Sequence, residues 1–419
     1  MRRFLFVLLA ISTGCDPEPI ETSNPDTTYY RDVRPVLDTY CSRCHTEEGA
    51  APMDLTDPDI AVSLAEVMLG QIDAGTMPPP VSDPECHEYL NSERMQITTE
   101  DRDIIARWIE LGSPLGDIAT LTTVPKLFMQ LEEPDLEVRI PKPYTPAFED
   151  TSNPGNEYRC FAIDHGQTED FYITGLAPVI DNSEMVHHVV IAKVDKSEIS
   201  EEYQKEEGWS CINGEGPSQI SGMVAGWAPG MVPVQFEEGT GMKVSPDDRL
   251  IIQMHYYAYG PDAAVDTDQS GYEFTTASSV DTEILMYPFG PTSFRIPAGD
   301  DSYSKSSSFT MPSGIQAKAY GSFPHMHNLG AGYHLTIQKS DGTNQCILKS
   351  DRWSFENQLT YMFPEPIALE AGDTIKFECT WNNSKSNASR PLEEPVDTRY
   401  GERTDEEMCF AFTFLSIGG

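Results

Sequence analysis

Basic side chains are scarce in this chain, which has 28 Lys and Arg against 67 Asp and Glu and a net charge of −39. A surface this acidic repels the phosphates of nucleic acids and of anionic lipids, which argues against both as partners. Long apolar runs are also lacking, since none approaches the roughly 18 residues that a membrane-spanning helix needs. We therefore expect a well-solvated acidic surface, with contact to a membrane only through an attached lipid.

The amino terminus has the pattern of a bacterial export signal. Two arginines precede an apolar run at residues 4–11, and small residues lead from there to Cys15. A Thr-Gly pair directly before Cys15 resembles a lipoprotein cleavage site, although Ser12 departs from the Leu, Val or Ile that such sites prefer. We expect an export signal over residues 1–15, a lipid anchor at Cys15 on the periplasmic or outer surface, and a flexible linker at residues 16–28.

A Cys-x-x-Cys-His motif is formed by Cys41, Cys44 and His45, after a stretch with apolar residues at helical spacing. This spacing is that of c-type haem attachment, in which two thiols on one turn bond to the vinyl groups and the next imidazole binds the iron. A structural zinc site is the alternative, but no second Cys or His pair lies nearby in the sequence to complete it. The motif therefore predicts one covalently attached haem.

The sixth ligand of the iron is expected to be Met77, which lies on a proline-fixed loop. Met68 lies in an apolar helical pattern and is better explained as core, while Met53 is a second alternative close after the motif. A further helix is predicted to stop at Gly112. Residues 29–118 resemble the small, all-α cytochrome c domains fused to bacterial periplasmic enzymes.

From residue 119 onwards, short apolar runs alternate with Gly, Pro, Asn and Asp, as is typical of β-sandwiches. This part is too long for one sandwich, and a polar, turn-rich stretch near residues 260–282 divides it. We predict a mainly β protein with two tandem antiparallel, jelly-roll-like sandwiches at residues 119–275 and 276–419. The clearest strands are expected at residues 171–179, 183–194, 249–259, 283–290, 316–327, 332–339 and 373–381.

Two histidine pairs lie in these expected strands. His325 and His327 are one residue apart, which places both imidazoles on the same face of a strand, where they can close on one metal ion. His187 and His188 are adjacent, so both can reach one metal only at a strand end or a bulge. Each pair taken alone is also explained by a half-buried strand.

His255 and Met408 extend these pairs into an ordered set, although either residue alone would be read as ordinary core. With this set the chain resembles the copper type II ascorbate-dependent monooxygenases over residues 125–419. The resemblance includes connecting sequence at residues 226–244 and between residues 379 and 409.

The resemblance implies two copper ions with different ligands. The electron-transfer copper would be bound by His187, His188 and His255. The catalytic copper, where dioxygen and substrate meet, would be bound by His325, His327 and Met408. The division agrees with ligand chemistry, because a soft thioether favours Cu(I) and an all-imidazole site tolerates both oxidation states.

Six cysteines remain once Cys15 and the haem motif are set aside, which allows up to three disulfides in an oxidising compartment. The resemblance implies two of them. One joins Cys379 to Cys409 and the other joins Cys160 to Cys211. The sequence does not place Cys86 and Cys346.

The resemblance also implies the reaction, which is hydroxylation of a substrate C–H bond with dioxygen and two electrons. We expect the electrons to come from an ascorbate-like reductant or a periplasmic redox protein, through the haem to the three-histidine copper. The positions that hold a peptide carboxylate in the peptide-hydroxylating members are occupied here by Phe323, Phe410 and Phe412. A small, apolar organic substrate is therefore expected instead of a peptide.

Two other classes of function remain open. One is a non-catalytic haem and copper electron carrier or a copper-handling lipoprotein, which has little need for two dissimilar copper sites. The other is oxidative cleavage of polysaccharides, which normally uses an amino-terminal histidine that neither Cys15 nor Asp16 supplies.

Overall fold

The structure is a computed structural model that describes residues 26–418, apart from residues 48, 50, 52, 125–130, 150–154, 212–215, 218–219, 259–264, 388 and 390–393. The predicted export signal and Cys15 lie outside the described residues. Across the part that is described, no helix combines the length and the apolar character needed to cross a membrane.

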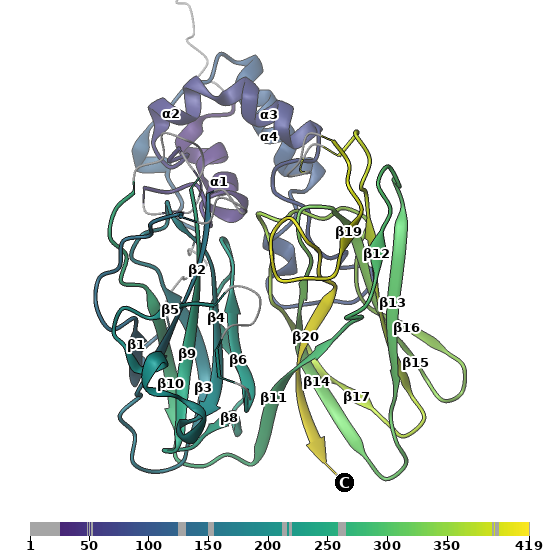
Figure 1. Cartoon of the computed structure of the whole chain (residues 1–419). Helices are drawn as coiled ribbons and strands as arrows, with labels where there is room; N and C mark the ends of the chain where they lie inside the picture. The colour runs from purple at the N-terminus through teal and green to yellow at the C-terminus, as the bar shows by residue number, and fades with distance from the viewer. Residues whose placement is uncertain are drawn as a thin grey trace, which may run out of the picture.

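Two β-sandwiches stand side by side, and a helical unit lies across one end of both (Figure 1). The first sandwich comes from the middle of the chain and the second from its carboxyl-terminal part. The observed architecture is therefore mainly β, in agreement with the sequence. His188 on β4 of the first sandwich and His325 on β14 of the second have ring centroids 6.2 Å apart, so the two sandwiches meet at these histidines.

The N-terminal sandwich is built from two antiparallel sheets. One sheet contains β1 (Leu136–Arg139), β10 (Gly271–Ala277), β3 (Phe171–Val179) and β8 (Thr240–Val244), with β7 (Val234–Gln235) beside β3. The other contains β6 (Gly222–Trp227), β4 (Val186–Asp195), β9 (Asp248–Tyr257), β2 (Asn156–Ile163) and β5 (Trp209–Ser210). The expected strand at residues 171–179 coincides with β3, because its Val, Ile and aromatic residues fit a buried strand.

The C-terminal sandwich packs one four-stranded sheet against another. The first contains β11 (Thr282–Phe289), β20 (Phe410–Gly418), β14 (Gln316–His325) and β17 (Tyr361–Leu369). The second contains β13 (Tyr303–Thr310), β18 (Thr374–Trp381), β15 (Gly330–Gln338) and β16 (Asn344–Ser350), and a small ribbon pairs β12 (Arg295–Ile296) with β19 (Thr398–Arg399). Strand β11 also pairs with β6 and β8, so it joins the two sandwiches directly.

The helical unit has its own small core. Its elements are η1 (Tyr29–Val33), α1 (Arg34–Tyr40), α2 (Pro58–Ser63), α3 (Ala65–Asp73), η2 (Ser92–Arg94), α4 (Thr99–Glu110) and η3 (Ile118–Thr120). Helix α4 begins where the Thr98 side chain accepts the Asp101 N–H at 3.1 Å, and Gly112 follows it with a φ of 83°. Tyr29 and Trp108 are fully buried at the centre of this core. Two short 3₁₀ turns, η4 (Lys196–Glu198) and η5 (Glu201–Gln204), lie in the N-terminal sandwich.

One stretch of the amino-terminal region packs into the sandwich core instead of the helical core. Val81, Tyr89 and Met95 belong to the large hydrophobic cluster of the sandwiches. The ring centroids of Tyr89 and Tyr361 are 4.7 Å apart, and the Ser82 N–H donates to the Tyr361 hydroxyl at 2.9 Å. The helical unit is thereby fixed to the C-terminal sandwich by buried contacts.

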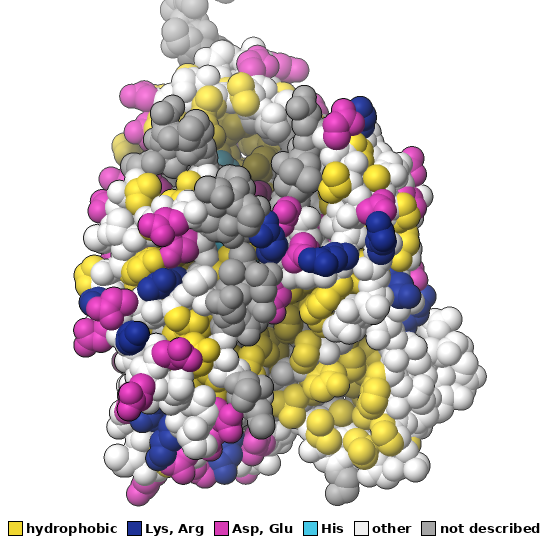
Figure 2. Space-filling model, in the orientation of Figure 1, with side chains coloured by type: hydrophobic (Ala, Val, Ile, Leu, Met, Phe, Trp, Pro, Cys, Tyr) yellow, Lys and Arg dark blue, Asp and Glu magenta, His cyan; other side chains and the backbone are white. Residues whose placement is uncertain are grey.

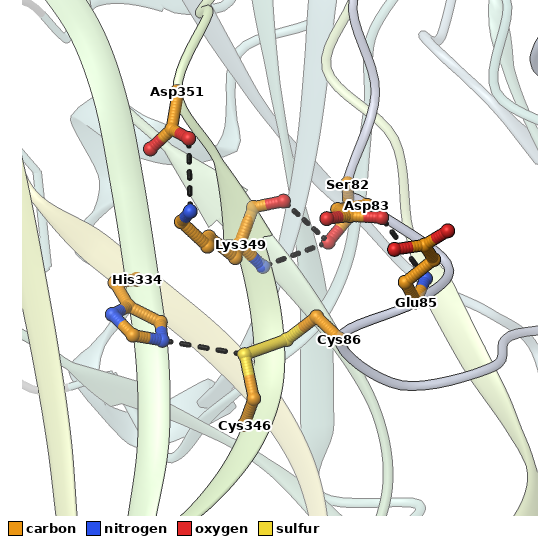
Figure 3. The surroundings of a disulfide bond; sticks show 8 residues. All are labelled: Ser82, Asp83, Glu85, Cys86, His334, Cys346, Lys349 and Asp351. Atoms are coloured by element: carbon orange, nitrogen blue, oxygen red, sulfur yellow. Dashed lines mark hydrogen bonds and ion pairs between the residues drawn. A yellow bond between two sulfur atoms is a disulfide. The ribbon is translucent and has the colours of Figure 1, made fainter.

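A disulfide between Cys86 and Cys346 strengthens this attachment (Figure 3). It joins the amino-terminal region to β16 across 260 residues of sequence. Beside it, the Lys349 N–H donates to the Ser82 hydroxyl at 2.9 Å, and a His334 ring nitrogen lies 3.3 Å from the Cys346 sulfur. The pairing that the sequence left open is therefore a covalent link between two parts of the fold.

Removing this link by the double substitution Cys86→Ser/Cys346→Ser is expected to lower the free energy of unfolding by about 2–4 kcal/mol, because a long loop would be released in the unfolded chain. Denaturant unfolding of the purified, oxidised protein measures the change. The matched control is Cys160→Ser/Cys211→Ser, which opens a loop of only 51 residues and should cost less. A larger loss in the control would contradict the assignment of Cys86–Cys346 as the main covalent constraint.

The surface agrees with the acidic composition. Acidic side chains are spread over the face seen in Figure 2, and very little histidine reaches it. Hydrophobic side chains gather over the lower part of the C-terminal sandwich in the same view. Leu285 and Tyr287 on β11 and Ile417 on β20 are exposed apolar side chains of the C-terminal sandwich.

Candidate metal centres and the Cys41–His45 turn

A β-bulge brings His187 and His188 onto the same side of β4. In the pairing of β4 with β9, Val186 lies opposite Tyr256 and His188 lies opposite His255, so His187 is the extra residue of the bulge. The two imidazole centroids are 4.1 Å apart as a result. The sequence required either a strand end or such a bulge if both side chains were to face one metal.

His255 completes the first cluster from β9. One ligand atom from each of His187, His188 and His255 can be chosen so that all three lie within 4.8 Å of one another. His187 and His255 are almost fully buried. We call this group the three-histidine cluster.

Outer hydrogen bonds orient two of these rings. Glu356 Oε2 lies 3.0 Å from His187 Nε2, and Asn156 Oδ1 lies 2.8 Å from His255 Nε2. An acceptor at Nε2 fixes the proton there and leaves Nδ1 as the atom that can bind a metal. The ring of Tyr158 also stacks on His255, at 4.2 Å between centroids.

His325 and His327 lie at the end of β14, with ring centroids 5.1 Å apart. Nδ1 of His325 is 2.7 Å from Gln358 Oε1, and Nδ1 of His327 is 3.0 Å from the Glu406 carbonyl oxygen. Both acceptors hold a proton on Nδ1, so Nε2 is the candidate ligand atom in each ring.

Backbone pairing places Met408 beside these two histidines. His325 lies opposite Phe410 in the β14–β20 ladder, and the His327 N–H donates to the Glu407 carboxylate at 3.0 Å. Met408 stands between those two contact points in the sequence, and Cys409 is held to Cys379 by a disulfide. We call His325, His327 and Met408 the mixed cluster, since it combines imidazole with thioether.

One short segment lies between the two clusters. Residues 355–358 connect β16 to β17, and Gln358 is fully buried there. Its amide oxygen accepts from His325 Nδ1, and its amide nitrogen lies 3.2 Å from His188 Nε2. The imidazole centroids of His188 and His325 are 6.2 Å apart. The two clusters therefore face each other across the junction of the sandwiches.

Burial keeps these imidazoles neutral. It lowers the pKa of His325 to about 4 and that of His327 to about 3, with the neighbouring histidine adding to the effect on His327. It also holds the pKa values of His188 and His255 well below the ordinary value. Neutral imidazole is the form that binds a metal, so the environment prepares both clusters for one.

Three imidazoles suit copper in either oxidation state, and a thioether added to two imidazoles suits Cu(I). The residues present therefore fit two copper ions with different properties. Cys379 and Cys409, which lie next to the mixed cluster, form a disulfide and leave no competing thiolate. The other implied disulfide, Cys160–Cys211, is also present.

The haem motif forms a tight turn directly after α1. The Cys44 and His45 N–H groups both donate to the Cys41 carbonyl oxygen, at 3.1 and 2.9 Å. Within the described part of the chain, Cys41 and Cys44 are the two cysteines that form no disulfide. Two thiols on one turn followed by an imidazole fit covalent haem attachment, and burial raises the pKa of the Cys41 thiol to about 12.

The candidates for the sixth iron ligand differ in exposure. Met77 follows α3 on a loop and is 42% exposed, and Met53 is 47% exposed. Met68 packs against the core of the helical unit, as its helical pattern predicted. Met77 stays the prediction from the sequence.

Three phenylalanines form an apolar surface beside the mixed cluster. Phe323 on β14 stacks on Phe412 of β20 at 5.9 Å, and Phe410 lies 5.5 Å from Phe412. The Phe412 ring is 6.3 Å from the ring of His325. A molecule held against these rings would lie close to the mixed cluster.

Two parts of the chain match known domain families. Residues 146–260 match the N-terminal domain of the copper type II ascorbate-dependent monooxygenases, and residues 301–415 match the C-terminal domain. The first match contains the three-histidine cluster, the second contains the mixed cluster, and together they cover more than half of the chain. The chain belongs to the copper type II ascorbate-dependent monooxygenase family.

Individual relatives agree with this family. A DBH-like monooxygenase protein 2 from Homo sapiens is 26% identical over 257 residues, which are 56% of this chain and 48% of the human protein. The Mus musculus protein of that name is 26% identical over 253 residues, or 56% of this chain and 38% of the mouse protein. The chain thus spans about half or less of the length of these relatives.

Solved structures add nothing to the assignment. The empty particle of cowpea mosaic virus aligns with 71% of this chain and 95% of its own, at 10% identity and a TM-score of 0.28. The broad bean stain virus structure covers 72% of this chain and 95% of its own at 8% identity, with a TM-score of 0.27. Scores this low support no argument about either fold or function.

Several residues of the family site were not foreseen from the sequence. Glu356 and Gln358 contact the clusters from a loop, Asn156 orients His255, and Glu407 is buried under His327. Burial raises the pKa of Glu407 to about 8. The one sequence signal was the polar run at residues 356–358 between apolar neighbours.

Replacing Glu356 by glutamine is expected to weaken copper binding at the three-histidine cluster by about 10- to 100-fold, because the carboxylate that orients His187 is lost. Titration of the apoprotein with Cu(II), followed by electron paramagnetic resonance, measures the affinity. Glu378→Gln is the matched control, since Glu378 forms an ion pair with Lys376 on the surface of the C-terminal sandwich. Unchanged affinity in Glu356→Gln would show that His187 needs no such partner.

Proposed function

We propose that the protein is an exported copper-dependent monooxygenase that hydroxylates a C–H bond of a small, apolar organic substrate. The reaction takes up dioxygen, two electrons and two protons, and it returns the hydroxylated product and water. One observation carries the proposal. In a member of this family, the three-histidine cluster faces the mixed cluster, and the two clusters offer different metal ligands. Copper bound there would supply the electrons and activate dioxygen.

Each histidine cluster would hold one copper with its own role. His187, His188 and His255 would hold the copper that passes electrons. His325, His327 and Met408 would hold the copper at which dioxygen and substrate meet. His325 Nδ1 would donate to Gln358 Oε1 and His327 Nδ1 to the Glu406 carbonyl oxygen, which holds each ring in one tautomer and leaves its Nε2 atom available.

The phenylalanines beside the mixed cluster would select the substrate. Phe323 is buried, and its ring would lie 3.3 Å from a Cβ placed on Gly226 of the other sandwich. Apolar walls at this point exclude water from the reaction site and give no cation for a carboxylate. Small aromatic or aliphatic molecules therefore fit this surface better than peptides with a free carboxyl end.

The turn of Cys41, Cys44 and His45 would carry a covalent haem that relays electrons from an ascorbate-like reductant or a periplasmic redox protein. Two observations support this role. Cys41 and Cys44 form no disulfide among the described residues, and the disulfide Cys86–Cys346 links their part of the chain to the C-terminal sandwich. Met77 would supply the sixth ligand. A tethered redox centre suits an enzyme that needs two electrons in each turnover.

Export and a lipid anchor at Cys15 belong to the same proposal. Three disulfides are present, and such bonds persist in oxidising compartments. Covalent haem attachment by a Cys-x-x-Cys-His motif would also suit an exported protein. Mass spectrometry of the mature protein from a bacterial membrane fraction would detect a lipid on Cys15.

The proposed function is tested by expressing the exported protein with copper and haem supply, and by measuring oxygen uptake with a reductant and phenethyl or aliphatic substrates. We expect one haem and two coppers per chain, with oxygen uptake that depends on both substrate and reductant. Full metal loading without substrate-dependent uptake would favour an electron carrier. A protein that takes up no copper would refute the proposal.

A further inference from the structure

Four consecutive residues connect the haem-attachment turn with both histidine clusters. The Phe355 ring lies 4.9 Å from His187, and residues 356 and 358 contact the clusters through the hydrogen bonds described above. The remaining residue, Asn357, contacts the haem-attachment turn, because its Oδ1 accepts from Arg43 Nη2 at 3.4 Å. The 355–358 segment therefore touches three potential redox sites at once.

Arg43 is the residue that joins the turn to this segment. It lies between Cys41 and Cys44, and only 9% of it is exposed. Besides Asn357, its guanidinium donates to the Gly230 carbonyl oxygen at 3.0 Å. Arg43 thus binds the N-terminal sandwich through Gly230 and the C-terminal sandwich through Asn357.

The packing around this arginine is tight. A Cβ placed on Gly230, which has a φ of 83°, would lie 3.1 Å from the Cys44 sulfur. Asn357 is itself held, because its amide nitrogen donates to the Pro80 carbonyl oxygen at 3.2 Å. The attachment cysteine is therefore fixed directly against one sandwich, and the arginine beside it against both.

The chemistry of Arg43 is unusual for a structural contact. Burying a guanidinium is costly unless its donors are satisfied, and the acceptors that Arg43 contacts within the described residues are two neutral oxygens. A buried cation beside the haem-attachment turn would stabilise additional negative charge close to it. Added electrons or haem propionates would supply that charge.

We propose that Arg43 is a positioning residue that seats the haem-attachment turn on the 355–358 segment, so that electrons enter at the junction between the two clusters. The inference rests on the haem and copper content of the proposed function. With haem and copper bound, each transferred electron would oxidise one Fe(II) to Fe(III) and reduce one Cu(II) to Cu(I). An external one-electron donor of the ascorbate class would re-reduce the iron, twice in each turnover.

Electrons that enter at the 355–358 segment could reach both clusters and not the three-histidine cluster alone. Glu356 leads to His187, and Gln358 leads to both His188 and His325. The Cys86–Cys346 disulfide and the Tyr89–Tyr361 contact hold the helical unit in place against the same sandwich that carries the segment. The unit therefore cannot swing away from the junction without breaking a covalent bond or a buried contact.

The test follows electrons directly, without turnover. The haem of the full-length protein, loaded with Cu(II), is reduced rapidly in the absence of oxygen. Its reoxidation is followed by absorption, and the loss of the Cu(II) signal by electron paramagnetic resonance. Pulsed electron paramagnetic resonance on the fully oxidised protein gives the distance from haem to copper.

We expect Arg43→Met to slow haem-to-copper transfer by at least about tenfold and to broaden or lengthen the haem-to-copper distance, with haem and copper content unchanged. Arg43→Lys should recover part of the rate, because it keeps the charge but not the forked geometry. Asn357→Leu is a second, independent variant that removes the same contact from the other side. The matched control is Arg107→Met, whose ion pair with Glu110 lies on the surface of α4.

A transfer rate in both Arg43→Met and Asn357→Leu that stays within twofold of the wild type, with haem attached, would overturn the inference and leave the proposed function standing. A wild-type protein with two coppers but no covalent haem would overturn both the inference and the proposed role of the haem. The haem absorption spectrum separates these two results.

Discussion

His327→Ala is expected to lower the rate of substrate hydroxylation by at least about 100-fold, because it removes a ligand from the mixed cluster, where substrate and dioxygen would meet. Copper content should fall from two ions per chain towards one, with the three-histidine cluster still filled. Oxygen uptake and copper analysis on the same preparation measure both effects.

His334→Ala is the matched control for this substitution. His334 is half buried on β15 beside the Cys86–Cys346 disulfide, away from both clusters, and its loss should leave activity within about twofold. If His327→Ala kept full activity, or still bound two coppers, the mixed cluster would not be the site at which copper activates dioxygen.

The second large effect is expected from Cys41→Ala/Cys44→Ala, which removes both thiols that can bond to haem. The covalent haem spectrum should disappear while both coppers stay bound, because the two clusters lie on the sandwiches. Turnover with a protein redox partner should be lost almost completely. Turnover with excess ascorbate should persist, since a small reductant can reach copper directly.

This pair of donors is what makes the double substitution informative. If turnover were lost equally with both electron donors, the helical unit would support the fold of the site instead of supplying it with electrons. Equal retention with both donors would mean that the haem has no part in the reaction. Denaturant unfolding of the variant identifies a general loss of structure.

Much of the fold follows from local sequence pattern. Residues 171–179 form β3, and the helix predicted to stop at Gly112 is α4, because in both the apolar spacing and the stop signals agree. The bulge at His187 and His188 is one of the two arrangements, a strand end or a bulge, that let adjacent strand residues share a face. The prediction of the copper ligands depended on the joint order of six residues and on the family resemblance.

Other features could not be read from the sequence. Val81, Tyr89 and Met95 pack in the sandwich core, although they lie within the range predicted for the haem domain. The Cys86–Cys346 bond spans 260 residues, a distance over which no local pattern carries information. The 355–358 segment looks like an ordinary polar loop, because its role depends only on what surrounds it in space.

Buried polar groups explain why this loop escapes sequence analysis. Gln358 is fully buried, and its amide contacts His325 and His188, which come from two other strands, as well as the nearby Phe355 carbonyl oxygen. Likewise, Asn357 and Arg43 satisfy each other across 314 residues of sequence. Such pairs carry no periodicity and become visible only in the folded chain.

The most direct measurement of the central claim is the origin of the oxygen atom in the product. The copper- and haem-loaded protein is incubated with a phenethyl or aliphatic substrate and a reductant under ¹⁸O₂ in unlabelled water, and the product is analysed by mass spectrometry. We expect one ¹⁸O atom in each hydroxylated product and none when the labels are reversed. A product that takes its oxygen from water, or no product from a protein carrying both coppers, would contradict a copper monooxygenase.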